Sequence, residues 1–235
     1  MPVLTLPVRD NIVVTPRARI LRLDLQHHRF CFQAGQAVLA GAHGQPMRRP
    51  YSIAIAPEDA ARDGVLELLV QVEEDGQVPE HLPSGTGTLM DAEGPVGAFT
   101  FPDRVSEQHL LFVAGGTGIA PLRSMLRHVL RTAPNHDIAL LYSARRPDEF
   151  AYEAELRGLA ARGRLRLHQT ITRETGAEWN ATRGRIDRAL LSGMLRDEQT
   201  LCFVCGPQTL VQEIPTALMA LGVAPERIRT DAWVA

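Results

Sequence analysis

The pattern of hydrophobic and polar positions divides the chain into two halves near residue 103. Residues 8–101 consist of short runs with strand periodicity, separated by turns rich in glycine and proline. Hydrophobic residues largely alternate with charged ones in Ala18–Leu25, and Val65–Val72 is a second β-rich run bounded by Asp-Gly pairs. Many short strands with frequent turn signals are typical of a small barrel. We therefore predict an antiparallel β-barrel domain for residues 1–103.

After residue 103, apolar runs suited to buried strands alternate with segments of helical spacing. The expected strands cover residues 109–114, 138–142, 165–171 and 201–205. The expected helices cover residues 122–130, 150–161, 186–195 and 208–221. Strands that alternate with helices form a parallel sheet with helices on both faces. Residues 104–235 are therefore predicted to form a doubly wound α/β domain.

Composition narrows the class of protein. The chain has 235 residues, of which 45% are hydrophobic and 22% charged, so two small domains can each bury a core. Its formal net charge of -2 gives no footprint for nucleic acid. No apolar run approaches the roughly 18 to 20 residues that span a bilayer, and the first residues lack a signal-peptide layout. We expect a cytoplasmic monomer that binds neither nucleic acid nor membrane.

The cysteines limit the redox chemistry. Cys31, Cys202 and Cys205 are too few for a four-cysteine iron–sulfur cluster. No second cysteine pair accompanies Cys202 and Cys205, which argues against a zinc site. We therefore predict no metal, and any redox centre must come from a non-covalent cofactor.

A glycine-rich turn follows the first predicted parallel strand, at 115–121. Glycines let the backbone approach a pyrophosphate closely, and the next helix directs free N–H groups at the anion. Proline in the first helical turn loses no hydrogen bond, because that N–H has no partner inside the helix. The turn predicts a dinucleotide-phosphate site at Gly116, Thr117, Gly118 and Pro121.

Three further segments accompany this turn in a fixed order. They are Arg49-Pro50-Tyr51-Ser52, Gly94-Pro95-Val96-Gly97-Ala98-Phe99 and Cys205-Gly206-Pro207. The order resembles the ferredoxin–NADP⁺ reductase family over essentially the whole chain. The resemblance implies an FAD-binding barrel and an NAD(P)-binding domain, with hydride passing between NADPH and FAD. It also implies ferredoxin or flavodoxin as the electron partner.

The resemblance assigns the flavin site to the first of these segments. Arg49 would pair with a flavin phosphate, since its planar fork matches phosphate oxygens. Tyr51, after Pro50, would stack on the isoalloxazine as an aromatic platform. Ser52 would place its hydroxyl near N5, the flavin atom that accepts hydride.

A second flavin-phosphate loop is matched with one departure. Gly76, Gln77 and Val78 follow the family pattern, but Pro79 stands where a serine or threonine is usual. One hydroxyl contact to the pyrophosphate is therefore missing, which leaves FMN as an alternative to FAD. Backbone N–H groups of Gln77 and Val78 at a helix start would still serve.

The choice of nicotinamide nucleotide depends on arginines. Several arginines suit the adenosine 2′-phosphate of NADP, whereas an NAD site usually offers a carboxylate to the ribose 2′-hydroxyl. No acidic residue directly ends the 138–142 strand. We expect NADPH, with NADH as the alternative, and the arginines that resemble the family's phosphate grip are Arg145, Arg173 and Arg185.

Two more residues are expected to act with Ser52 in catalysis. Cys205 would line the nicotinamide beside Gly206 and Pro207, without serving as a nucleophile. Trp233 resembles the aromatic that covers the flavin in one bacterial subgroup, where it must move before nicotinamide can stack. Packing of Trp233 against the core is the equally weighted alternative.

Three other functions remain open at this point. The chain would also suit a reductase component of an oxygenase whose iron–sulfur cluster sits on another protein. A free-flavin or ferric reductase is a second possibility on the same fold. A non-catalytic flavin-binding electron-transfer subunit is the third, but the intact nucleotide motifs argue against it.

Overall fold

The structure, a computed structural model, describes residues 2–73, 76–173 and 179–233. These residues form two compact units. The first contains the chain up to Phe101 together with Arg123–His128 of one helix. The second contains Pro102–Leu122 and the chain from Val129 onward.

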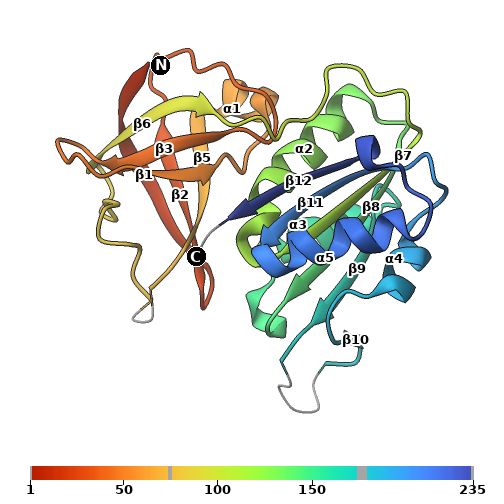
Figure 1. The fold of residues 1–235 in the computed structure, drawn as a ribbon. Helices are drawn as coiled ribbons and strands as arrows, with labels where there is room; N and C mark the ends of the chain where they lie inside the picture. Colours follow the sequence, from red (N-terminus) through yellow and green to blue (C-terminus); the bar gives the residue numbers. More distant parts are fainter. Residues whose placement is uncertain (1, 74–75, 174–178, 234–235) are drawn as a thin grey trace. The chain divides into compact units, whose positions relative to one another are not determined.

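The first unit is an antiparallel β-barrel, as predicted. Six strands occur in the order β4-β3-β6-β1-β2-β5. Figure 1 shows β1, β2, β3, β5 and β6 among the red to yellow arrows. A bridge between Ile53 and Leu68 joins the end of β4 to β5, so the two edge strands meet and close the sheet. The strands are β1 (Val3–Thr15), β2 (Ala18–Asp24), β3 (Ala37–Ala42), β4 (Arg49–Ser52), β5 (Val65–Gln71) and β6 (Leu89–Val96).

Alternation along the strands builds the barrel core. In β2, Leu21 and Leu23 are fully buried while the intervening Arg22 is only partly covered. Leu66 and Leu68 of β5 join them inside the same cluster. The period of two that predicted these strands therefore separates the interior from the exterior of the barrel.

A short helix, α1 (Pro57–Asp63), precedes β5 and was not predicted. Pro57 occupies its first turn with Glu58 and Asp59, and Gly64 ends it in the left-handed conformation at φ 65°. These are ordinary signals for the start and the end of a helix.

The second unit is a parallel sheet, again as predicted. Its strand order is β10-β9-β8-β7-β11-β12. The strands are β7 (His109–Gly115), β8 (Asp137–Ala144), β9 (Arg166–Ile171), β10 (Thr182–Arg183), β11 (Leu201–Pro207) and β12 (Ile228–Trp233). The helices are α2 (Ile119–Thr132), α3 (Glu153–Ala161), α4 (Arg188–Met194) and α5 (Gln208–Met219), with single 3₁₀ turns at Gly116–Gly118, Pro147–Glu149 and Pro225–Arg227.

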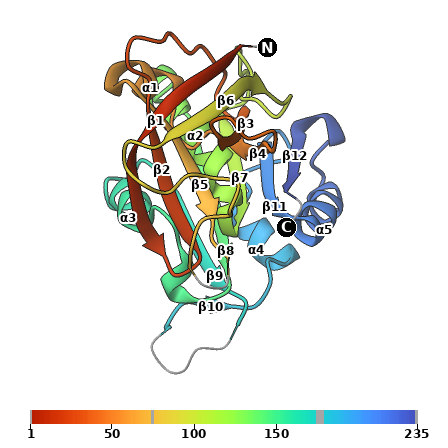
Figure 2. The same cartoon turned by 90° about the vertical axis from the view of Figure 1, so that its left-hand side faces the viewer.

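Helices cover both faces of this sheet. Leu191 of α4 and Ile214 of α5 pack with alternate residues of β7, β8 and β11 in one hydrophobic cluster. Figure 2 shows α3 on the opposite side of the sheet from α5.

The helix expected from residue 150 begins only at Glu153, because Tyr152 before it takes a left-handed conformation at φ 60°.

The strand order reverses at β7. The chain moves from β7 to β8 and β9 on one side, and β11 and β12 lie on the other side of β7. Ligands of doubly wound sheets bind beyond the carboxyl ends of the strands at such a switch point. The residues that follow β7 and end β11 are therefore the first place to look for a site.

Candidate functional site

The glycine turn after β7 lies against the C-terminal end of β11 at the switch point. A Cβ on Gly118 would overlap the carbonyl oxygen of Cys205 and lie 2.7 Å from Cα of Gly206. A Cβ on Gly115 would lie 2.8 Å from Cδ of Pro207. Only glycine permits this approach, since real Cβ atoms do not come so close to backbone. The turn and the end of β11 therefore form a backbone surface that suits a pyrophosphate group.

Helix α2 begins directly after this turn. Gly118 is its N-cap and Pro121 its third residue, so the missing N–H of Pro121 costs no helical hydrogen bond. Gly116 has φ 54°, a conformation that favours glycine. The sequence-predicted residues Gly116, Thr117, Gly118 and Pro121 thus lie together at a helix start.

Tyr142 of β8 holds this turn and was not singled out by the sequence. Its hydroxyl donates to the carbonyl of Gly116 at 3.0 Å and accepts from the backbone N–H of Ala151 at 3.3 Å. The side chain is fully buried, and burial raises the pKa of its phenol far above the ordinary value. The phenol is therefore neutral and acts as a fixed support for the glycine turn.

Cys205 lies at the end of β11 and is 2% exposed. Burial, followed by the charge of Asp231, raises the pKa of its thiol well above the ordinary value. A thiol in that state is a poor nucleophile, which agrees with a role in lining a site rather than in covalent chemistry.

Cys202 and Cys205 do not form a paired redox motif in the described chain. Cys202 packs in the cluster with α4 and α5, and three residues later along a strand the side chain points to the opposite face. Burial raises the pKa of the Cys202 thiol to about 12. All three cysteines are free, and Cys31 is exposed.

Asp231 of β12 is a further charged group near this site. It lies opposite Cys205 in the parallel β11–β12 register. Burial raises the pKa of its carboxyl. The sequence does not single out Asp231, because nothing in it reveals which strand β12 joins. The backbone of Trp233 pairs with Pro207, but the side chain of Trp233 lies outside what the structure describes.

The three predicted arginines follow different strand ends. The backbone N–H of Arg173 donates to the carbonyl of Arg145 at 2.9 Å, so these two residues are neighbours beyond β8 and β9. Arg185 follows Gly184, whose N–H donates to the carbonyl of Ile171 at the end of β9. The Arg185 side chain, however, lies 3.5 Å from the Glu213 carboxylate of α5.

The Arg49–Ser52 segment forms β4 of the barrel. It pairs with β3, with Val38 opposite Tyr51 and Ala37 opposite Ser52. Arg49 and Pro50 are exposed, whereas Tyr51 and Ser52 are half-buried. The strand therefore presents a guanidinium and an aromatic ring at the barrel surface. The guanidinium suits a flavin phosphate, and the aromatic ring suits the isoalloxazine.

Tyr51 contacts a residue that the sequence did not single out. Its hydroxyl lies 2.8 Å from Nε2 of His81, and the two rings stack at 5.9 Å between centroids and 26° between planes. Burial raises the pKa of the Tyr51 phenol to about 12. Burial, together with the positive charge of Arg49, lowers the pKa of His81.

The expectation of a helix start at Gln77 and Val78 is wrong. Residues 76–88 form turns, and the N–H of Gly76 donates to the carbonyl of Glu73 rather than standing free. Pro79 and Pro83 are only four residues apart, so proline disrupts any helix between them. Asp75, the first residue of the expected loop, lies outside the described residues.

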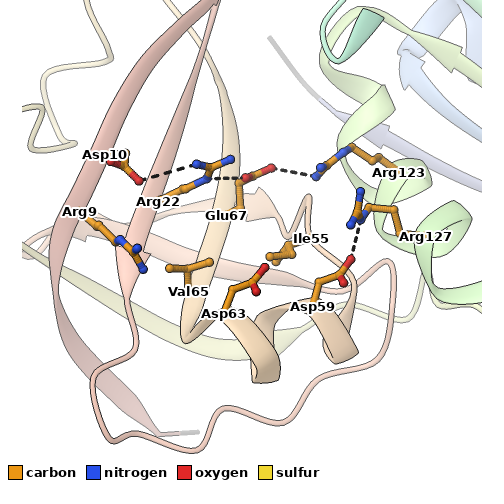
Figure 3. A pocket seen from close by; sticks show the side chains of 10 residues that line it. All are labelled: Arg9, Asp10, Arg22, Ile55, Asp59, Asp63, Val65, Glu67, Arg123 and Arg127. Carbon is orange, nitrogen blue, oxygen red and sulfur yellow. Dashed lines mark hydrogen bonds and ion pairs between the residues drawn. The ribbon is translucent and has the colours of Figure 1, made fainter. Parts of the chain in front are cut away.

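A pocket of about 460 Å³ lies in the first unit, and no predicted site residue is among the side chains that line it (Figure 3). Most of its charged side chains pair with one another. Glu67 lies 2.8 Å from both Arg22 and Arg123, and Asp59 lies 2.5 Å from Arg127. Because these charges satisfy each other, we interpret the pocket as an ion-pair network that anchors Arg123–His128 rather than as the active site.

Comparison with known proteins identifies both halves. Residues 5–101 match the family of oxidoreductase FAD-binding domains, and residues 112–215 match the family of oxidoreductase NAD-binding domains. The fold and these matches define a two-domain flavoprotein oxidoreductase that uses FAD and a nicotinamide dinucleotide.

Individual relatives narrow this class. Ferredoxin–NADP reductase B of Sorangium cellulosum (strain So ce56) is 34% identical over 215 residues, covering 87% of this chain and 86% of that protein. Reductase component 1 of terephthalate 1,2-dioxygenase from Comamonas sp is 30% identical, covering 97% and 68%. A ferredoxin–NADP⁺ reductase of Neisseria gonorrhoeae with bound FAD and NADP shares the fold, with a TM-score of 0.80, 20% identity and 99% coverage of both chains. The chain belongs to the ferredoxin–NADP⁺ reductase family.

Two kinds of feature are absent from the described residues. In residues 2–73, 76–173 and 179–233, no helix is long and apolar enough to cross a membrane. Over the same ranges, no group of three or more histidine, cysteine, aspartate or glutamate residues could hold a metal ion.

Proposed function

We propose that the chain transfers hydride from NADPH to FAD and passes the electrons to ferredoxin or flavodoxin, as a cytoplasmic monomer. In this proposal residues 1–103 bind FAD and residues 104–235 bind the nucleotide. The observation that carries it is the close packing of Gly115–Gly118 against Gly206 at the switch point, where a side chain would not fit. Such a surface suits the pyrophosphate of a dinucleotide.

The flavin assignments rest on β4. When bound, FAD accepts a hydride from reduced nicotinamide and can release the two electrons singly. Arg49 would hold a flavin phosphate with its forked donors, and Tyr51 would support the ring by stacking. Ser52 would line the reactive edge of the flavin, and Gly76, Gln77 and Val78 would border the phosphates. Trp233 would cover the flavin face opposite Tyr51.

Catalysis in this proposal is mostly positioning. Hydride transfer requires aligned donor and acceptor atoms at near-contact distance, so it needs no nucleophile. Cys205, protonated at neutral pH because its pKa is raised, would contribute shape and exclude water. Gly206 and Pro207 would complete the nicotinamide side.

Arginines support NADPH as the nucleotide. Arg145 and Arg173 are backbone neighbours beyond β8 and β9, and no carboxylate directly follows β8. Two guanidinium groups there favour a 2′-phosphate over a free ribose hydroxyl. Arg185 would bind the same phosphate once its ion pair with Glu213 is broken. NADH is the alternative if these arginines stay engaged elsewhere.

The electron acceptor has a second candidate. The similarity to an oxygenase reductase component over 97% of this chain favours a dedicated oxygenase partner as the alternative to ferredoxin or flavodoxin. A free-flavin or ferric reductase would need no protein partner at all.

Anaerobic reduction tests the proposal directly. Flavin absorbance of the purified protein is followed while NADPH or NADH is added. We expect fast bleaching at low NADPH concentration and much slower bleaching with NADH. Equal or faster bleaching by NADH would keep the reductase and remove the roles of Arg145, Arg173 and Arg185. A flavoprotein that neither nucleotide reduces would contradict the proposed function.

A further inference from the structure

His81 lies at the proposed flavin site without a role in the family pattern that the sequence resembles. Its backbone carbonyl accepts from the N–H of Ala42 at the end of β3, at 2.8 Å. Val78 and Leu82 on either side are 7% and 4% exposed and belong to the barrel core. Local packing therefore fixes the backbone that carries the His81 ring.

The ring of His81 is held against Tyr51. Nε2 lies 2.8 Å from the Tyr51 hydroxyl, and the rings are stacked. Imidazole can keep this contact in both charge states: neutral, it accepts from the phenol, and protonated, it donates to the phenol oxygen. Protonation of His81 therefore does not require Tyr51 to move.

The charged groups near this pair come from two segments. Arg49 of β4 lowers the pKa of His81 and Glu73, after β5, raises it, while burial is the largest influence and lowers it. The same two charged groups act on Tyr51. Arg49, Tyr51, Glu73 and His81 thus form one cluster, in which Arg49 repels a proton on His81.

We propose that His81 is a second phosphate-binding residue of the flavin site, which strengthens binding of FAD when it is protonated. This inference rests on the proposed function, in which Arg49 holds a flavin phosphate. His81 would take the place of the hydroxyl that Pro79 removes, by supplying a charged N–H donor from the same loop.

The sign of the pH effect follows from linkage. A phosphate placed on Arg49 offsets the repulsion between Arg49 and protonated His81, and it attracts the imidazolium itself. Phosphate binding therefore favours the protonated form, and protonation must favour phosphate binding by the same factor. FAD affinity should rise as the pH falls through the titration range of His81. Riboflavin has no phosphate, so its affinity should stay constant.

The test is a flavin titration of the flavin-free full-length protein at about pH 8 and about pH 5, with the acidic value set well below an ordinary histidine titration because burial and Arg49 lower the pKa of His81. FAD is the probe because its pyrophosphate does not titrate there, whereas the monoester of FMN does, with a pKa near 6. Riboflavin is the matched ligand without phosphate. The variants are His81→Gln, which keeps a hydrogen bond to Tyr51, and His27→Gln, at an exposed histidine in the turn after β2.

For the wild type we expect the Kd of FAD to be about 3- to 10-fold lower at the acidic pH, since one pKa unit of coupling corresponds to tenfold. His81→Gln should bind FAD with a nearly constant Kd, while His27→Gln should behave as the wild type. His81→Arg, whose side chain is charged at both pH values, is a second test variant. Its affinity for FAD should be high and the same at both pH values.

Other results would overturn the inference. A pH effect that persists in His81→Gln, or in His81→Arg should the first variant not fold, would exclude His81 as its source. An equal pH effect with riboflavin would exclude the phosphate. If the Kd of FAD for the wild type does not depend on pH, the inference about His81 is wrong and the reductase proposal stands. If the wild type binds no flavin, the proposed function itself fails.

Discussion

At the scale of single residues, the clearest effects on stability are expected where a buried polar group has defined hydrogen-bond partners. Tyr142 is such a group, because its hydroxyl satisfies both Gly116 O and Ala151 N–H inside the second unit. Replacement by phenylalanine keeps the ring and leaves both backbone groups without this partner. Unsatisfied buried groups typically cost about 1–3 kcal/mol.

We therefore expect Tyr142→Phe to lower the free energy of unfolding by about 1–3 kcal/mol. It should also weaken NADP⁺ binding, since the Gly116 carbonyl is then free to shift the turn, and leave FAD affinity unchanged. Urea unfolding and separate ligand titrations measure these effects. Unchanged NADP⁺ affinity would show that the turn keeps its shape without the phenol.

The contribution of Asp231 to stability should depend on pH in the opposite direction to that of most carboxylates. Because burial raises its pKa in the folded protein, folding favours the protonated form. Its favourable contribution is complete below the unfolded pKa of about 3.9 and is lost as the pH rises through the folded pKa. At neutral pH a charged Asp231 therefore destabilises the fold.

We expect Asp231→Asn to be more stable than the wild type near pH 7, with a difference that shrinks toward zero below about pH 4. Paired thermal melts at a series of pH values measure it. A difference that is the same at every pH would mean that Asp231 does not titrate in the folded protein as inferred. Because Asp231 lies beside Cys205 in the register, the same variant reports on the electrostatics of the proposed nicotinamide side.

At the scale of elements, the start of α2 depends on a close approach that can be tested with matched glycines. Gly118 has an ordinary helical φ of -60°, so alanine meets no backbone strain there, only the atoms of Cys205 and Gly206. Gly193 is exposed in α4, and a Cβ there meets nothing within 4 Å.

We expect Gly118→Ala to weaken NADP⁺ binding by at least about tenfold, equivalent to about 1.4 kcal/mol, because the glycine turn and the end of β11 must move apart. Gly193→Ala should leave binding unchanged and stabilise the helix by about 0.5–1 kcal/mol. Isothermal titration with NADP⁺ compares the two variants. Equal affinities in both would show that the close approach of the turn to β11 does not shape the nucleotide site.

The sequence locates elements that have a clear hydrophobic period, whereas it does not locate β1, with 13 residues, or α1 individually. Periodicity locates β2, β5 and the strand–helix alternation of the second unit, since burial on one face dictates it. Helix α1 has good terminal signals but only seven residues, too few to show a period among strands. The expected helix start at Gln77 and Val78 is wrong because it extends the family pattern up to Pro79, where this sequence departs from that pattern.

The candidate site divides along similar lines. Motifs continuous in the sequence, such as Arg49–Ser52 and the 115–121 turn, can be found from the chain alone. His81, Tyr142 and Asp231 cannot, because each meets its partner through tertiary contacts: Tyr51 is 30 residues from His81, and Gly116 is 26 from Tyr142. A lone histidine in a turn carries no signal of this kind.

At the scale of the whole molecule, each unit has its own hydrophobic core. One cluster of buried residues lies inside the barrel, and another lies between the parallel sheet, α4 and α5. The residues assigned to flavin phosphates and to the nucleotide pyrophosphate belong to different units. Ligand binding should therefore leave a separate footprint in each unit.

We expect hydrogen exchange to resolve the two footprints. At about 100 times Kd, a ligand stabilises its binding-competent state by about 2.7 kcal/mol, which slows exchange through local opening by up to about 100-fold. FAD should protect amides in residues 49–53 and 76–82 most strongly, and NADP⁺ those in residues 115–121 and 205–207. Riboflavin should protect the region around 51–53 but less around 76–82, where the phosphates are proposed to lie. Protection by NADP⁺ confined to the barrel, with the 115–121 turn unchanged, would contradict the assignment of the glycine turn, and with it the observation on which the proposed function rests.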